Sequence, residues 1–130
     1  GWLDTTVLDI VQNRMPILIL DASAACHMPD VLEMPYRPPL INAGEPNEKA
    51  VTCRLAARTC LAGDVIGDYS FDRMPEVGER LTFGDMAIYS MVKTNTFNGM
   101  PLPAIAYQRE DEDCELVKTF GYEDFKSRLS

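Results

Sequence analysis

The sequence has few of the features that would point directly to a nucleic-acid partner. It contains one histidine and one tryptophan in 130 residues, and its 12 Lys and Arg are outnumbered by 20 Asp and Glu, for a formal net charge of −8. Phosphate binding requires clustered basic side chains, so we expect no nucleic-acid partner. A cationic small molecule suits this balance better, although the charge also serves solubility alone.

Long apolar runs and paired cysteines are also lacking. The longest apolar run, residues 16–20, is far shorter than the roughly 20 residues that cross a bilayer, and the acidic start Gly-Trp-Leu-Asp does not resemble a signal peptide. The four cysteines form no Cys-x-x-Cys pair, which argues against a zinc site. We therefore expect no membrane span, no metal, reduced thiols and a cytoplasmic protein.

Short segments with β-type composition, separated by Pro and Gly, make up most of the chain. Residues 5–11 and 15–21 predict a hairpin. Further strands are expected at 50–56, 81–83, 102–108 and 114–120, and 85–93 is a strand or a short helix. Prolines between 22 and 39 permit only a short helix near 29–34, and 122–129 predicts another. Residues 1–130 are thus expected to form one mainly β domain, a Greek-key-like β-barrel or sandwich with short helices.

Glycines punctuate residues 58–69, which also carry Cys60, Asp64 and Asp68. This composition predicts a loop in which Gly63 and Gly67 adopt positive φ or approach a ligand closely. Such a loop would present the thiol and the carboxylates at the rim of a cavity. The alternative is an ordinary surface loop between two strands, with a half-buried cysteine.

Cys60 has three possible roles on its residue type alone: nucleophile, proton donor or inert core thiol. Nucleophile is the weakest, because only Arg58 supplies a nearby positive charge that would lower the thiol pKa. A Cys–His hydrolase would need His27, the only histidine, to meet Cys60 in space, and no local signature supports that. His27 is more simply a hydrogen-bonded structural residue.

Carboxylates in apolar surroundings are candidates for binding amines or a metal. Glu33, Asp64 and Asp68 form this set, and Asp64, between Gly63 and Val65, is the strongest of them. A turn or capping role is the alternative for Glu33 and Asp68. By spacing alone, Tyr89 and Phe97 are expected to be core aromatics.

Three strings of residues resemble a known family in order and spacing. They are Thr59-Cys60-Leu61-Ala62-Gly63-Asp64, Asp85-Met86-Ala87-Ile88-Tyr89 and Thr96-Phe97-Asn98-Gly99. They are similar to the carboxy-terminal domain of the pyridoxal-phosphate decarboxylases of the alanine-racemase fold, the ornithine and diaminopimelate decarboxylase group. Residues 21–23, 27–38 and 59–69 look most like the members that act on carboxynorspermidine or carboxyspermidine. Leu61 stands where an acidic residue often follows the cysteine, which leaves Asp64 as the matching carboxylate.

The resemblance implies a polyamine-forming decarboxylase whose cofactor is pyridoxal 5'-phosphate. An amino-terminal α/β barrel of the TIM type would supply the Schiff-base lysine and most of the phosphate site, neither of which is recognisable in this sequence. The active site would form across a homodimer, and this chain alone is expected to be inactive. A stand-alone β-barrel module that binds cationic ligands or a protein partner is the alternative function.

The resemblance also implies roles for individual residues. Cys60 would protonate the carbon from which carbon dioxide departs, and Tyr89 would contact the cofactor phosphate. Asp64 and, as a second ligand, Glu33 would bind substrate amines. Phe97 and Asn98 would shape the pocket and the subunit interface.

Overall fold

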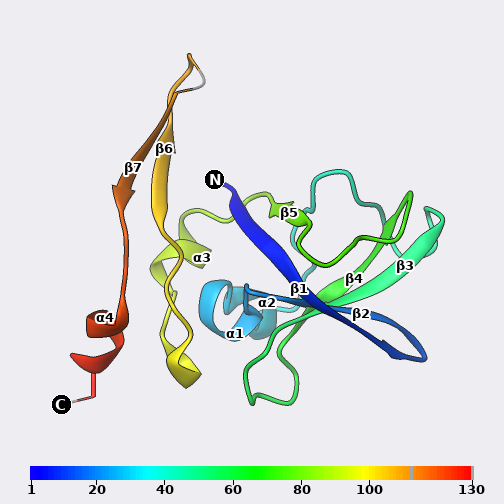
Figure 1. Ribbon diagram of the computed structural model, residues 1–130, viewed down its shortest axis with the longest axis horizontal. Coiled ribbons are helices and arrows are strands. Elements are labelled where there is room, and N and C mark those ends of the chain that lie inside the picture. The colour runs from blue at the N-terminus through cyan, green and yellow to red at the C-terminus, as the bar shows by residue number, and fades with distance from the viewer. Residues whose placement is uncertain (112, 130) are drawn as a thin grey trace.

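A curled five-stranded sheet forms the body of the protein (Figure 1). The computed structural model describes residues 1–111 and 113–129. The sheet has the strand order β4-β3-β2-β1-β5. Its strands are β1 (Leu3–Asn13), β2 (Met15–Leu20), β3 (Val51–Ala56), β4 (Val65–Phe71) and β5 (Arg80–Phe83). The prediction of a mainly β, barrel-like domain with short helices is confirmed.

The predicted hairpin of β1 and β2 is present, and Arg14 makes its turn with φ 64°. Leu18 and Leu20 of β2 are fully buried, but Ile17 and Ile19, which alternate with them, are only half-buried. The sheet encloses one continuous core, whose largest fully buried side chain is Phe83 of β5. Burial of these side chains, at about 25 cal/mol per Å² of apolar surface, is the main term that stabilises the sheet.

β2 and β3 are parallel, whereas the other neighbouring strands of the sheet are antiparallel. A parallel pair requires a long crossover, and residues 21–50 supply it. Two single-turn helices lie on this crossover, α1 (Ala24–His27) and α2 (Asp30–Glu33). α2 is the short helix that the sequence predicts near Pro29, while α1 was not predicted.

A segment of the same crossover closes the curl between the outer strands. Leu40 forms a bridge with Phe83 of β5, and Gly44 forms one with Ser70 of β4. The Ile41 amide donates to the Thr82 carbonyl at 3.0 Å, and Gly44 and Ser70 exchange two hydrogen bonds of 2.9 and 3.0 Å. The five strands and this segment together enclose the core as a barrel does.

The last third of the chain stands beside the barrel (Figure 1). Its elements are α3 (Tyr89–Val92), the 3-10 turn η1 (Phe97–Gly99), β6 (Ile105–Gln108), β7 (Cys114–Lys118) and α4 (Tyr122–Lys126). β6 and β7 form a separate antiparallel hairpin, and all five residues of β7 are exposed. Within the described residues, no helix is both long and apolar enough to span a bilayer.

One prediction about the glycine-punctuated stretch is wrong. Its second half is not a loop, because Val65–Phe71 is β4, a strand with four buried residues. Neither Gly63 nor Gly67 has a positive φ. Gly67 instead makes room for a neighbour, since an added Cβ would lie 3.0 Å from Arg37 Cγ. The true loop is the connection from β3 to β4, residues 57–64.

Candidate functional site

Cys60 lies at the exposed tip of the loop between β3 and β4. Its backbone amide donates to Oδ1 of Asn98 at 2.7 Å. Asn98 and Gly99 both have positive φ, 63° and 72°, as expected of an Asn-Gly turn. This turn directs the Asn98 side chain to the Cys60 amide, so two of the predicted site residues meet in space although 38 positions separate them.

Asp64 closes the other end of this loop and is buried, with 4% of its surface exposed. Ser23 Oγ donates to its Oδ2 at 2.7 Å, and the Ala25 amide donates to its Oδ1 at 3.1 Å. The Thr59 hydroxyl also donates to Oδ2. All three donors belong to the protein itself. The carboxylate predicted to bind a substrate amine therefore already accepts three hydrogen bonds within this domain.

Ser23 connects Asp64 to helix α1. It is the N-cap of α1, and its hydroxyl accepts the Cys26 amide at 3.1 Å while donating to Asp64. Its own amide donates to Nδ1 of His27 at 3.1 Å, and Nε2 of His27 bonds the Pro101 carbonyl at 2.9 Å. Ser23, which is fully buried, thus connects the Cys60 loop through His27 to Pro101, which lies between η1 and β6.

These contacts rule against His27 as the partner of Cys60 in a hydrolase. Both ring nitrogens are engaged, and because Nδ1 accepts an amide proton the neutral ring carries its own proton on Nε2. Burial lowers the pKa of His27 below its ordinary value, which favours this neutral form. His27 is the hydrogen-bonded structural residue that the sequence favoured.

Asn95 attaches the turn containing Asn98 to the opposite side of α1. Its amide donates to the Cys26 carbonyl and its side-chain Nδ2 to the Ala25 carbonyl, both at 2.9 Å. Its Oδ1 accepts the Phe97 amide at 3.0 Å. The four-residue helix α1 thereby holds both loops: Asp64 binds its amino end, and Asn95 binds its carbonyl groups.

Tyr89 and Glu33 form a second group around α3. Ile88 precedes the helix with φ 59°, an uncommon conformation for a β-branched residue, and Tyr89 follows with 70% of its surface exposed. Lys93, just after the helix, pairs with Glu33 of α2 at 2.7 Å, and this hydrogen bond raises the pKa of the Lys93 ammonium. Ser90 Oγ donates to Asp30 Oδ2 at 3.1 Å, so α3 is fixed to α2.

The two aromatic site residues are not core residues, and that expectation is wrong. Tyr89 is mostly exposed and Phe97 is 46% exposed. Both aromatic side chains are therefore accessible at the surface of the chain.

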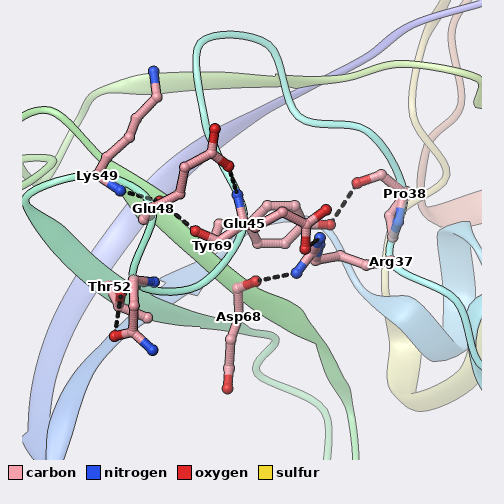
Figure 2. Close-up of polar contacts among 10 residues, drawn as sticks. Arg37, Pro38, Glu45, Glu48, Lys49, Thr52, Asp68 and Tyr69 are labelled. Atoms are coloured by element: carbon pink, nitrogen blue, oxygen red, sulfur yellow. Dashed lines mark hydrogen bonds and ion pairs between the residues drawn. The ribbon is translucent and has the colours of Figure 1, made fainter.

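A hollow of about 490 Å³ lies elsewhere, between α2 and β4. Its lining includes Tyr36, Arg37 and the candidate carboxylate Asp68, but not Cys60, Asp64 or any of the site residues that the family resemblance implied. Figure 2 shows what stabilises its wall: Arg37 lies over the Tyr69 ring at 5.2 Å, donates to the Asp68 carbonyl and pairs with Glu45. Tyr69 donates to the Pro38 carbonyl at 2.6 Å. The polar side chains of the lining, those of Tyr36, Arg37, Arg54 and Asp68, each contact another residue of the chain, so we do not treat the hollow as the site.

The sequence model of one family matches residues 1–87, and its description is pyridoxal-dependent decarboxylase, C-terminal sheet domain. The chain belongs to this family. Among curated relatives, the carboxyaminopropylagmatine decarboxylase of Synechocystis sp. is 48% identical over 130 residues, which cover 99% of the chain and 34% of the relative. The carboxynorspermidine/carboxyspermidine decarboxylase of Campylobacter jejuni is 36% identical and is covered to 37% of its length.

Solved structures of the family share the fold. The crystal structure of carboxynorspermidine decarboxylase from Campylobacter jejuni, complexed with norspermidine, superposes with a TM-score of 0.93 at 35% identity over 98% of the chain and 38% of that structure. Diaminopimelate decarboxylase from M. jannaschii, at 21% identity, has a TM-score of 0.78. The chain spans between 30% and 38% of the length of these relatives.

Ser23, Thr59 and Asn95 are the residues of this decarboxylase domain that the sequence did not reveal. Ser23 carried a usable signal, since a serine just before a short apolar run is a common N-cap. Thr59 and Asn95 carried none, because their partners lie in distant segments. Among the described residues, no three His, Cys, Asp or Glu side chains gather in a group that could hold a metal ion.

Proposed function

We propose that this chain is the carboxy-terminal sheet domain of a pyridoxal-phosphate decarboxylase that removes the α-carboxylate of carboxynorspermidine or carboxyspermidine. The observation that carries this proposal is the exposed Cys60, whose backbone amide donates a hydrogen bond to Asn98 and so fixes the loop that carries the thiol. Family membership favours this function over a stand-alone module that binds cationic ligands.

The residues present fit a domain that completes a cofactor site built mainly elsewhere. Pyridoxal 5'-phosphate, when bound, supplies the electron sink for decarboxylation. Tyr89 has a largely exposed side chain on a helix fixed to α2, and we assign its hydroxyl to the cofactor phosphate. The remaining phosphate contacts and the Schiff-base lysine would come from an amino-terminal α/β barrel.

Cys60 is proposed to deliver the proton that completes the reaction. The bond between the α-carbon and the carboxylate breaks, carbon dioxide leaves without the bonding electron pair, and the thiol proton forms the new C–H bond. The resulting thiolate takes a proton back from water. A general acid in this role must come within hydrogen-bond distance of the α-carbon.

The substrate end of the site is proposed to include Glu33, with Phe97 and Asn98 shaping the pocket. Glu33 is exposed and its carboxylate already pairs with Lys93, so it would exchange that ammonium for one on the substrate. We further propose a cytoplasmic homodimer in which this site faces the cofactor of the partner subunit. Asp64 was predicted as an amine ligand, but its geometry supports another role, which is argued below.

A second candidate substrate is carboxyaminopropylagmatine, because the relative with that activity in its name is 48% identical to this chain. This molecule ends in a guanidinium, whereas the carboxylated polyamines end in an ammonium. Both cations suit an acidic pocket, and their different shapes make them distinguishable by kcat/KM.

The test uses this domain joined to its amino-terminal barrel in one protein, supplied with pyridoxal phosphate and assayed with each of the three substrates. Release of carbon dioxide and formation of the decarboxylated amine are expected for at least one of them. In the Cys60→Ala variant, abortive transamination should rise relative to decarboxylation. An unchanged ratio would rule out Cys60 as the proton donor, and no turnover of any of the three would refute the proposed function.

A further inference from the structure

We propose that Asp64 is a positioning residue: its buried carboxylate fixes the loop that carries Cys60 to helix α1, rather than binding substrate. The catalytic part of this inference rests on the proposed function. The structural part stands on contacts within the domain and can be tested without cofactor.

The first argument is the burial of the carboxylate and its hydrogen bonds to donors of the protein itself. Asp64 is 4% exposed and accepts hydrogen bonds from two hydroxyl groups and one amide. A substrate ammonium would have to displace donors from Ser23, Thr59 or Ala25 and bury its own charge. Desolvation of a cation is costly unless a complete set of partners replaces its water. The Asp64 carboxylate thus binds hydrogen-bond donors of the protein itself.

The second argument is the place of Asp64 in the loop. Its backbone carbonyl accepts the Ala57 amide at 3.0 Å, and its amide donates to the Leu61 carbonyl at 3.1 Å. Its side chain reaches Thr59, the residue before Cys60, and crosses to Ser23 and Ala25 of the α1 region. One residue therefore determines both the internal shape of the loop and its attachment.

The third argument is the second restraint, on the opposite side of Cys60. Asn98 accepts the Cys60 amide at 2.7 Å, and Asn95 ties the turn containing Asn98 to the carbonyl groups of α1. Both restraints thus end on the same short helix. The thiol itself is left exposed, so its backbone is fixed while its reactive atom stays available. Displacement of a catalytic group by about 1 Å can reduce a rate about a hundredfold. The two restraints on the Cys60 backbone would prevent such a displacement.

The first experiment measures amide hydrogen exchange in the wild-type chain and in Asp64→Asn, with Asp68→Asn as the matched control. Asp68 is a carboxylate of the adjacent strand β4 that pairs with Arg54 instead. We expect exchange of the Cys60 and Ala57 amides to accelerate about tenfold or more in Asp64→Asn, as loss of a hydrogen bond to a charged group implies. Amides of β2 and β3 should keep their protection in all three proteins.

Unchanged exchange at Cys60 and Ala57 would overturn the proposal, and so would an equal loss of protection throughout the sheet. Should Asp64→Asn fail to fold, Thr59→Val removes one donor and leaves the carboxylate in place. The same local acceleration, of smaller size, is then expected.

The second experiment measures steady-state kinetics of the same variants in the two-domain protein, with carboxynorspermidine, carboxyspermidine or carboxyaminopropylagmatine, whichever is turned over. A positioning role predicts that Asp64→Asn lowers kcat at least tenfold, leaves KM within about twofold and shifts the reaction toward transamination as Cys60→Ala does. A raised KM with an unchanged kcat would instead identify Asp64 as a substrate ligand and overturn the proposal. If the wild-type protein turns over none of the three, the proposed function fails, while hydrogen exchange still decides the structural claim.

Discussion

Replacement of Ser23 by alanine should destabilise the protein more than removal of any single hydrogen bond would suggest. The Ser23 hydroxyl accepts the Cys26 amide as the N-cap of α1 and donates to the buried Asp64 carboxylate. Loss of an N-cap costs about 1 kcal/mol, and loss of a hydrogen bond to a charged group costs about 1.5–3 kcal/mol. The expected loss in free energy of unfolding is therefore about 2.5–4 kcal/mol.

Urea unfolding followed by far-ultraviolet circular dichroism measures this loss, since Trp2 is too exposed to report on the core by fluorescence. For a chain of this length the melting temperature should fall by about 10–15 °C. Ser90→Ala is the matched control. Its buried hydroxyl also donates to a carboxylate, that of Asp30, but caps no helix, so its removal should cost about 1 kcal/mol less.

A Ser23→Ala variant that loses less than about 1 kcal/mol, or no more than Ser90→Ala, would refute the reasoning. Such a result would mean that the backbone or a water molecule replaces both contacts easily. The attachment of the Cys60 loop to α1 would then not depend on Ser23.

Two further predictions concern the buried titratable groups. Burial lowers the pKa of His27 from its ordinary 6.5, so the unfolded chain binds this proton more readily and stability should fall as the pH drops below about 6.5. The free energy of unfolding, measured between about pH 7.5 and pH 5.5, should depend less on pH in His27→Gln; an unchanged slope would place the proton elsewhere. Burial likewise raises the pKa of Cys26 and Cys53, whereas Cys60 and Cys114 are exposed. Mass spectrometry during treatment with a thiol reagent should therefore show Cys60 and Cys114 labelled well before the buried pair, and simultaneous labelling of all four would contradict the observed burial.

Local sequence patterns predicted the elements that form because of residues adjacent in the sequence. The β1–β2 hairpin follows from two β-type runs around a short polar turn, and the turn at Asn98 follows from the Asn-Gly pair. β4 was missed because Gly63, Gly67 and two aspartates make its sequence look like a loop. In the fold, Gly67 is a strand residue that packs under Arg37, and no local pattern records a neighbour 30 positions away.

The candidate site likewise combines features that local sequence predicts with contacts between distant residues that it does not. The family resemblance predicted Cys60, Tyr89 and Asn98 as site residues, but not the long-range contacts that hold their loops. Ser23 and Asp64 are separated by 41 positions, and Asn95 reaches Ala25 across 70. The exposure of Tyr89 could not be predicted either, because an apolar run has the same composition whether it fills a core or faces another domain.

The crossover segment that closes the barrel also covers the edges of its outer strands. The outer strand of an open sheet exposes unpaired amide and carbonyl groups, to which a strand of another molecule can add. Here Gly44 occupies both backbone groups of Ser70, Arg37 occupies the Asp68 carbonyl, and Ile41 occupies the Thr82 carbonyl. Pro38 and Pro39, which lack an amide hydrogen, offer no donors in their place. The barrel therefore protects itself against strand addition with a segment that is not itself a strand.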